Sequence, residues 1–271
     1  MIIVSAMKKL SSNITPSLTI FCSLFKGGKF IEGYMEDIIN QTIFEDVVFY
    51  ILDCNSPENE EDTVQRYLGY ENIIYEKLDH DPGLYAAWNM CVKKADTDLV
   101  GNWNVDDRKT PWSLEVLRSA FMQNSNIDVA YGKTVVSFVE NENWDDINPY
   151  LYFPAAPTTN WRDLLGNNHP HCMPLWKRDL HDRYGFFDEK YLTAADSDMW
   201  IRAAKQDAKL FFVDETVGIY YKNPDGVSTD LKNLRKMLDE VNSMRRSHYP
   251  DYIDPPLPQA LLEYEKQNNE S

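Results

Sequence analysis

Two adjacent carboxylates, Asp106 and Asp107, are the residues whose types and spacing point most directly to chemistry. They follow a short apolar segment, and Asn104 stands just before them. In such a pair, one carboxylate can accept hydrogen bonds from a ligand hydroxyl while the other holds a divalent cation. Mg²⁺ prefers oxygen ligands and often binds through one or two carboxylates plus phosphate oxygens. The same residues would also suit a turn that opens the next helix near Pro111, so both interpretations stay open.

A second pair of carboxylates, Asp196 and Asp198, stands at the start of a predicted helix that carries Trp200. Acidic side chains in the first turn of a helix stabilise its dipole, which needs no further function. Alternatively, one of them is a general base that takes the proton of an attacking hydroxyl. An aspartate with the ordinary pKa of about 3.9 is a weak base, so proton transfer would come late in such a reaction. Spacing alone leaves both roles open.

The elements that must position these acids alternate between strand and helix in the first half of the chain. Apolar strands are predicted at residues 17–24, 47–53, 73–75 and 98–104, with amphipathic helices between them. This alternation predicts a parallel sheet with helices on both faces, and such sheets bind ligands beyond the carboxyl ends of their strands. The residues that follow these ends are Ser23, Phe25, Asp53, Asp79, Asp81, Asp106 and Asp107.

The second half of the chain has a less regular pattern. A long strand is predicted at residues 129–139, and residues 141–168 form a long aromatic segment without periodicity, which is typical of a functional loop. Two short strands at 210–213 and 218–221 precede an Asn-Pro-Asp-Gly turn. Leu and Val then recur at helical spacing over residues 231–241, which predicts an amphipathic helix.

Composition excludes several classes of protein. The 271 residues carry a net charge of -16, which disfavours binding to a phosphate backbone, so no nucleic-acid partner is expected. No apolar run approaches the ~20 residues that span a bilayer. Four cysteines without a CxxC pair, and no secretory signal, predict a soluble cytoplasmic protein with free thiols. His169, His171 and Cys172 make zinc conceivable, but no second ligand pair accompanies them.

Four segments, in order over about residues 18–228, together resemble the family 2 glycosyltransferases, the inverting type with a GT-A fold that uses a nucleotide-sugar. The first is LTIFCSLFKGGKFIEGYMEDIINQTIFEDVVFYILDCNSPENEEDT, which begins at Leu18. The second, HDPGLYAAWNMCVKKADTDLVGNWNVDD, ends at Asp107. The third and fourth are HPHCMPLWKRDLHDRYGFFDEKYLTAADSDMWIRAA and NPDGVS. Each element is weakly specific, but four in the right order are strongly indicative.

The resemblance implies an α/β class, GT-A (Rossmann-like) fold with a mostly parallel central sheet flanked by helices and a C-terminal helical tail. Residues 1–228 would form one domain, with a donor half at about 14–125 and an acceptor half at about 126–228. Residues 229–271 would form an amphipathic helix and tail. The implied activity is metal-dependent, inverting transfer from a nucleotide-diphosphate sugar, UDP-sugar favoured, to a glycan or other hydroxyl acceptor, lipid-linked or protein-linked.

The resemblance also implies roles for individual residues. Asp196 would be the general base, and Asp107 would hold Mn²⁺ or Mg²⁺ against the donor diphosphate. Asp106 would accept hydrogen bonds from the ribose hydroxyls. The other residues expected to bind the nucleotide-sugar are Ser23, Phe25, Asp53, Asp81, Gly83, Asn89 and Asn104.

Two positions depart from the family pattern. Cys54 stands where many relatives have a second Asp after Asp53, which bears on recognition of a uracil base. Asn104 stands where others carry the first acid of a D-x-D motif, which leaves Asp107 as the expected protein ligand of the metal. Mg²⁺ tolerates this because it keeps waters and takes phosphate oxygens.

The acceptor side is expected in the aromatic second half. Its aromatic residues either offer flat faces to sugar rings or pack the loop onto the sheet. The candidates for the acceptor cleft are Trp161, His169, His171, Trp176 and Asp198. The basic residues of the tail helix either meet an anionic membrane that holds a lipid-linked acceptor or belong to a helix packed on the domain. These residues are Lys232, Arg235, Lys236, Arg245 and Arg246.

Two alternative functions remain. One is a binding module of the same fold that holds a nucleotide-sugar or glycan without transfer, although a degenerate site would be free to lose Asp107 or Asp196. The other is a sugar nucleotidyltransferase. That class needs a loop rich in glycine and basic residues after the first strand, for which Lys26-Gly27-Gly28 is a poor match.

Overall fold

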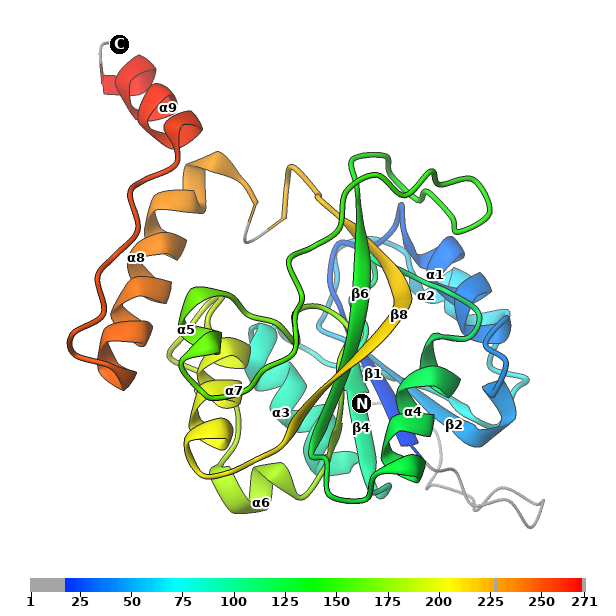
Figure 1. The fold of residues 1–271 in the computed structure, drawn as a ribbon. Coiled ribbons are helices and arrows are strands. Elements are labelled where there is room, and N and C mark those ends of the chain that lie inside the picture. The colour runs from blue at the N-terminus through cyan, green and yellow to red at the C-terminus, as the bar shows by residue number, and fades with distance from the viewer. Residues whose placement is uncertain (1–17, 227–228, 270–271) are drawn as a thin grey trace.

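A single eight-stranded sheet forms the centre of the computed structural model, which describes residues 18–226 and 229–269 (Figure 1). The strand order is β3-β2-β1-β4-β7-β6-β8-β5. The strands are β1 Leu18–Leu24, β2 Val47–Asp53, β3 Ile73–Lys77, β4 Leu99–Asn102, β5 Arg108–Lys109, β6 Val129–Ser137, β7 Leu175–Lys177 and β8 Leu210–Tyr221.

Most neighbouring strands in this sheet run parallel. β1 pairs in parallel with β2 and β4, β2 with β3, and β6 with β8. The short strand β7 is antiparallel to both β4 and β6, and β5 is antiparallel to β8. The predicted α/β class with a mostly parallel sheet is therefore confirmed.

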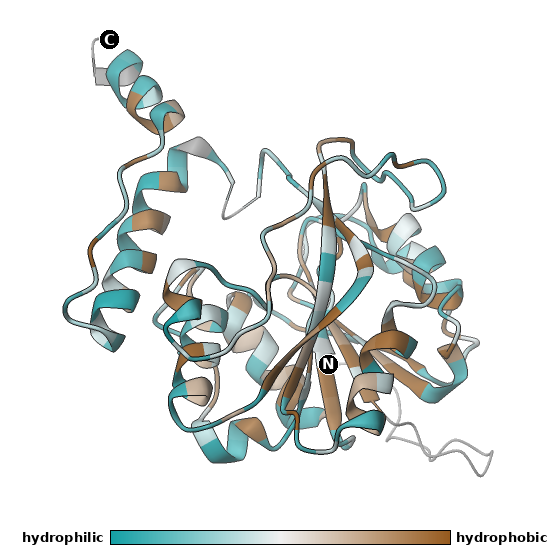
Figure 2. Ribbon diagram, viewed as in Figure 1, coloured by the Kyte–Doolittle hydropathy of each residue, from teal (hydrophilic) through white to brown (hydrophobic). Residues whose placement is uncertain are grey.

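Helices cover both faces of the sheet. They are α1 Ile31–Ile39, η1 Phe44–Asp46, α2 Glu61–Gln65, α3 Leu84–Lys94, α4 Ser113–Gln123, α5 Asp163–Gly166, α6 Leu180–Tyr184, α7 Ala195–Lys205, α8 Leu231–His248 and α9 Gln259–Asn269. Figure 1 shows α1, α2 and α4 on one side and α3, α6 and α7 on the other. Each side has its own buried core, with Tyr34 and Leu117 in one and Trp88 and Trp200 in the other. Figure 2 shows hydrophobic residues along the central strands and on parts of the helices.

The strands of the first half begin and end close to their predicted positions, whereas β8 differs. The two short strands predicted at residues 210–213 and 218–221 are one continuous strand, because β6 pairs with it along most of its length. Register shifts around Lys133 absorb the irregular, partly exposed middle of β8. The two-residue strand β5 is too short to give a periodic signal. The long segment at 141–168 is mostly irregular, as predicted, apart from α5 and a bridge between Val135 and Tyr152.

The C-terminal segment contains two helices. In Figure 1, α8 lies beside α7 and α9 extends beyond it. Within the described residues, no helix has the length and apolar character needed to cross a bilayer. All four cysteines are free and buried. The start of the expected donor half at residue 14 and the last two residues of the NPDGVS segment lie outside the described residues.

Candidate functional site

The parallel strands β1 to β4 end at one edge of the sheet, which we call the carboxyl edge. Register pairs Leu24 with Asp53, Asp53 with Lys77, and Phe21 with Asn102. The residues that follow these strands therefore meet at this edge. Ser23 is half-buried there and accepts a hydrogen bond from the indole N–H of Trp88 at 3.2 Å. Phe25, just beyond the strand, is 40% exposed.

Asp53 is buried at the end of β2 and is fully engaged by the protein. Its Oδ1 accepts from the backbone N–H of Ser56 at 2.8 Å, and its Oδ2 accepts from the Tyr75 hydroxyl at 2.6 Å. The ammonium of Lys77 lies 3.6 Å from Oδ2. Asp53 thus holds the loop that follows β2, which makes any contact with a nucleoside indirect.

The loop between β3 and α3 carries the exposed Asp81. Its carboxylate accepts from the backbone N–H of Gly83 at 2.8 Å. Gly83 has a φ of 86°, a left-handed conformation that favours glycine, and it immediately precedes α3. Asp81 and Gly83 therefore form a turn at the carboxyl edge that remains open to solvent.

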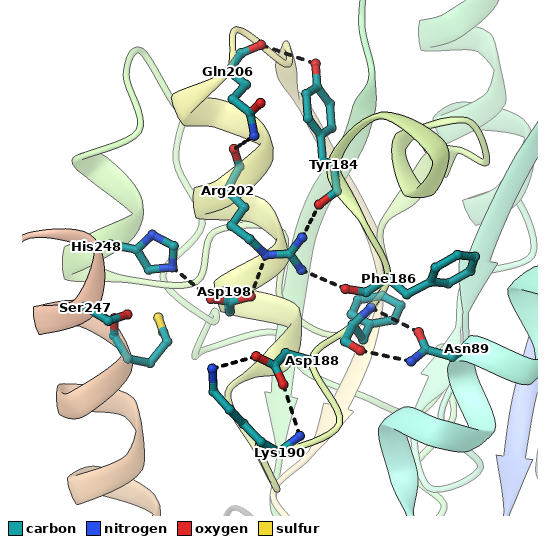
Figure 3. Close-up of polar contacts among 12 residues, drawn as sticks. Asn89, Tyr184, Phe186, Asp188, Lys190, Asp198, Arg202, Gln206, Ser247 and His248 are labelled. Atoms are coloured by element: carbon teal, nitrogen blue, oxygen red, sulfur yellow. Dashed lines mark hydrogen bonds and ion pairs between the residues drawn. The ribbon is translucent and has the colours of Figure 1, made fainter.

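Asn89 on α3 forms hydrogen bonds to the loop at residues 187–189 (Figure 3). Its Nδ2 donates to the carbonyl of Phe187 and to the carboxylate of Glu189, both at 2.9 Å, and its Oδ1 accepts from the N–H of Phe187 at 3.0 Å. The side chain is 2% exposed. Asn89 thus shapes the site through this loop instead of presenting its amide to a ligand.

Asp106 and Asp107 follow β4 and are held by the far end of β8. Asp107 is buried, and its two oxygens accept from the N–H of Tyr221 at 3.1 Å and from the Asn104 amide at 3.3 Å. Asp106 is half-buried and accepts from the Asn223 amide at 3.2 Å. Of the two carboxylates, Asp106 is the more accessible.

Burial and mutual repulsion shape the ionisation of this pair. Burial raises the pKa of Asp107 well above its usual value, and the neighbouring charge of Asp106 raises it further. Burial also raises the pKa of Asp106, while the Asn223 hydrogen bond opposes the shift. These raised pKa values favour the protonated carboxyls, and a cation bound between them would favour the charged forms instead.

Asp196 lies in the first turn of α7 and is held by two side chains from distant parts of the chain. The Tyr85 hydroxyl on α3 donates to Oδ1 at 3.1 Å, and the Asn168 amide donates to Oδ2 at 2.8 Å. We call Tyr85, Asn168 and Asp196 the base cluster. Burial raises the pKa of Asp196, and the backbone N–H of Ser197 and the Asn168 amide oppose the shift. A half-buried carboxylate with a raised pKa at a helix N-terminus suits proton transfer.

Residues 168–172 connect the base cluster to the carboxyl edge. Asn168 bonds to Asp196 at one end, and at the other the carbonyl of Cys172 accepts from Asn102 at the end of β4 at 3.4 Å. Four residues of extended chain span at most about 14 Å, so a short segment joins the loop that holds Asp196 to the end of β4. The base cluster and the carboxyl edge are thus linked through residues 168–172.

His171 stands in the middle of this connection. Its ring stacks on Phe153 with centroids 4.0 Å apart and meets Tyr220 edge-on at 4.9 Å. Burial lowers its pKa to about 4, so the imidazole is neutral near pH 7. In the described part of the chain, Oδ1 of Asn168 and Nδ1 of His171 are buried and lack a hydrogen-bond partner.

The other acceptor candidates are placed differently. Trp176 has no exposed surface and bonds to His181 within the core, so it has no face with which to contact an acceptor. Asp198 is buried and paired with Arg202 and His248 (Figure 3). Both are therefore left out of the acceptor site proposed below. Trp161 is half-buried beside Tyr249, and His169 is half-buried beside Asn167.

Two of these placements have no signal in the sequence, and one has a weak signal. Asn168 and Tyr85 contact Asp196 across 28 and 111 residues, which no local pattern reports. Asn223 belongs to the Asn-Pro-Asp-Gly turn that the sequence marks, and its contact with Asp106 explains why that turn lies at the site.

The oxygen atoms at Asp106 and Asp107 fit a hard divalent cation. Across the residues that the structure describes, no group of three or more His, Cys, Asp or Glu side chains is arranged as a metal site. Such a cation would therefore need the Asp106–Asp107 pair together with oxygens of the substrate, which is the way Mg²⁺ often binds. It would also offset the repulsion between the two carboxylates.

The loop after β1 has its backbone N–H groups already bonded. Lys26, Gly27 and Gly28 donate to Ser56 Oγ at 2.9 Å, Glu60 Oε1 at 2.7 Å and Glu58 Oε2 at 2.7 Å. Consecutive backbone N–H groups of this kind can cradle phosphates. Here two carboxylates and a hydroxyl take them, which argues against the sugar nucleotidyltransferase alternative.

A polar cavity of about 870 Å³ lies beside Arg108, which directly follows Asp107 in the chain. It is bordered by α1, by β5 and by residues 141–146, and it includes Asp37 paired with Arg108. Neither Asp106, Asp107 nor Asp196 lines it. The geometry of the carboxylates, and not the size of this cavity, therefore identifies the candidate site.

Comparison with known proteins identifies the family of the chain. Residues 19–185 match the family described as Glycosyl transferase family 2. An uncharacterized glycosyltransferase of Methanocaldococcus jannaschii is 26% identical over 201 residues, which are 73% of this chain and 67% of that protein.

Solved structures show the same fold at low identity. S. aureus TarS 1-349 in complex with UDP has a TM-score of 0.63 and 15% identity, over 94% of this chain and 72% of that one. The chain spans 65% of another TarS 1-349 structure. Mannosyltransferase PcManGT from Pyrobaculum calidifontis, in complex with GDP-Man and Mn²⁺, also has a TM-score of 0.63 and 15% identity, over 93% and 70%. These likenesses confirm the GT-A fold.

Proposed function

Because the chain belongs to glycosyl transferase family 2 and is a glycosyltransferase, we propose that it transfers a sugar from a nucleotide-diphosphate donor to a hydroxyl acceptor with inversion. Asp196 is the proposed general base. The observation that carries this proposal is the base cluster, in which Tyr85 and Asn168 donate hydrogen bonds to Asp196. Residues 168–172 connect this cluster to Asn102 at the end of β4.

The proposed reaction is one displacement. The acceptor oxygen attacks the anomeric carbon and forms the new glycosidic bond as the bond from that carbon to the diphosphate oxygen breaks. The acceptor proton passes to Asp196, and the electron pair of the broken bond leaves with the diphosphate. A base with a raised pKa is better matched to this transfer than an exposed aspartate.

Asp106 and Asp107 are the proposed ligands of Mn²⁺ or Mg²⁺. When bound, the cation would neutralise the charge that develops on the leaving diphosphate. Asp106 offers the accessible carboxylate, and Asp107 lies behind it, held by Tyr221 and Asn104. The PcManGT complex with Mn²⁺ supports this proposal by analogy.

The donor pocket is proposed at the carboxyl edge. Ser23, Phe25, Asp81 and Gly83 lie at its accessible part, while Asp53 and Asn89 act through the loops that they hold. A UDP-sugar is favoured because TarS, a structure of the same fold, binds UDP. PcManGT binds GDP-Man, so the donor base needs a direct test.

The acceptor is proposed to be a glycan or another hydroxyl compound, lipid-linked or protein-linked, that reaches Asp196 beside residues 168–171. The stack of Phe153, His171 and Tyr220 offers aromatic surface for this acceptor. We do not extend the proposal to a membrane contact through α8, because Arg235 pairs with Asp239 and Arg246 pairs with Asp254.

A donor screen tests the proposed function. Thermal unfolding of the full chain is measured with UDP-, GDP- and dTDP-sugars, each with and without Mn²⁺. A ligand at 100 times its Kd stabilises the native state by about 2.7 kcal/mol, so the true donor should raise Tm clearly and only with the cation. No response to any donor with Mn²⁺ would contradict the proposal.

A further inference from the structure

Helix α8 forms hydrogen bonds to the turn at Leu192 and Thr193, which precedes α7. The carboxylate of Glu240 accepts hydrogen bonds from the backbone N–H of Leu192 at 2.8 Å, the backbone N–H of Thr193 at 2.8 Å and the Thr193 hydroxyl at 2.9 Å. Three donors from two consecutive residues therefore converge on one carboxylate. Asp196 follows Thr193 by only three residues.

Helix α7 has no side-chain cap of its own at this end. Its N-cap residue is Ala194, and no side chain there accepts a hydrogen bond from the first turn. Helix N-termini expose unpaired N–H groups, and a polar side chain usually fixes the chain at that point. Here the fixing group comes from α8, 47 residues further along the chain.

Other contacts keep α8 in place along α7. Met244, one turn beyond Glu240, has no exposed surface. His248 bonds to Asp198 at 2.8 Å (Figure 3), and Lys205 at the far end of α7 donates to the carbonyl of His248 at 3.1 Å. Contacts at several points along both helices leave Glu240 little freedom to move away from the turn.

We propose that Glu240 is a positioning residue of the transfer reaction. It fixes the turn at Leu192 and Thr193, and through that turn it sets the place of Asp196 relative to the acceptor hydroxyl. Glu240 itself touches backbone and a hydroxyl of the protein and no substrate. The inference rests on the proposed role of Asp196 as the base.

The contact is suited to positioning because catalysis is sensitive to small displacements. A shift of the base by 1 Å can cost about a hundredfold in rate, while binding of the donor at another part of the site is unaffected. Among the described residues, the hydrogen bonds of Glu240 run to Leu192 and Thr193, so donor binding at the carboxyl edge should be unaffected by its loss. This separates a positioning role from general stabilisation of the fold.

Amide hydrogen exchange on the full chain tests the contact without any substrate. E240A should speed exchange of the Leu192 and Thr193 amides and of the first turn of α7 about tenfold, while β1 to β4 keep their protection. The matched control is D239N, since Asp239 is the exposed neighbour on the same helix. Unchanged exchange at residues 192–199 in E240A would overturn the proposal.

Steady-state kinetics with the donor found in the screen then test the role. E240A should lower kcat at least tenfold and leave the donor KM within about twofold, and D239N should match the wild type. E240Q keeps one acceptor oxygen and should recover part of the loss, and it serves if E240A does not fold. Wild-type kcat in both Glu240 variants, or a loss expressed in donor KM, would overturn the proposal.

The two experiments separate this inference from the proposed function. If the wild-type chain turns over no nucleotide-sugar, the proposed function fails, and the exchange measurement still decides whether Glu240 fixes the turn. If the wild type is active and Glu240 variants keep full kcat, only the positioning role fails.

Discussion

The carboxyl edge and the base cluster are built in different ways. At the carboxyl edge, the candidate residues come directly after β1, β2 and β4, and the register of parallel strands brings them together. In the base cluster, Tyr85, Asn168 and Asp196 come from a helix, an irregular loop and a second helix. The first arrangement depends on local chain order, and the second depends on tertiary contacts that several elements must maintain.

The difference suggests a division of work between the two regions. Under the proposed function, the sheet edge would supply a rigid platform for the donor, and the assembly of loop and helices could vary with the acceptor. Variants at the carboxyl edge should therefore change donor and cation binding, and variants in the base cluster should change turnover. The predictions below test that separation, beginning with the largest expected effect.

Replacing Asp196 should give the largest loss of turnover. D196N removes the proposed proton acceptor while keeping the size of the side chain, and a general base contributes typically about 10² to 10⁴ in rate. We expect kcat to fall about a thousandfold. The measurement is release of the nucleoside diphosphate. D182N is the control, because Asp182 is an exposed carboxylate on α6. Loss of donor affinity in D196N would contradict the separation.

Replacing Asp107 should act on binding. In D107N the pair with Asp106 loses one charge, so the cation and diphosphate lose a ligand and a counter-charge. We expect donor affinity in the presence of Mn²⁺ to fall at least tenfold by calorimetry, with little change when Mn²⁺ is absent. An unchanged Mn²⁺-dependent affinity would remove Asp107 from the proposed cation site.

The ion pair between Asp198 and Arg202 on α7 should affect stability. Asp198 is buried between Arg202 and His248, and these partners hold its pKa below the usual value although burial opposes them. D198N should cost about 2 kcal/mol in the free energy of unfolding, because it leaves Arg202 without its charged partner.

The sign of the pH dependence follows from the lowered pKa of Asp198. Its contribution is fully present above the unfolded pKa of about 3.9 and is lost as pH falls through the lower folded value. The stability difference between wild type and D198N, measured by urea unfolding, should therefore shrink below about pH 4. A constant difference down to pH 3 would argue against the ion pair.

Removing the Asn168 amide should have the smallest effect and a definite direction. The amide donates to Asp196 and stabilises its charged form, so N168A should raise the pKa of Asp196 further. Activity requires the deprotonated base, so the acidic limb of the pH–rate profile should move to higher pH, with a loss of a few-fold near pH 7. The neighbouring substitution N167A should leave the limb in place.

The features that could be predicted from the sequence are those with local signals, as at the carboxyl edge, and the features that could not depend on tertiary contacts. β2 at Val47–Asp53 and the acids after the strands could be predicted because apolar runs and their ends are local signals. The burial of Trp176 and the pairing of Asp198 with His248 could not, because both depend on elements distant in the chain. The hydrogen bond between Glu240 and Thr193 could not be predicted either, because no periodicity within α8 indicates it.

One paired measurement tests the central claim, that Asp196 performs the chemistry while Asp106 and Asp107 hold the donor. Donor affinity with Mn²⁺ and turnover are measured on the same preparations of wild type, D196N and D107N. We predict that D196N keeps wild-type affinity with about a thousandfold lower turnover, and that D107N loses Mn²⁺-dependent affinity. Substantial turnover in D196N, with donor bound normally, would contradict the account.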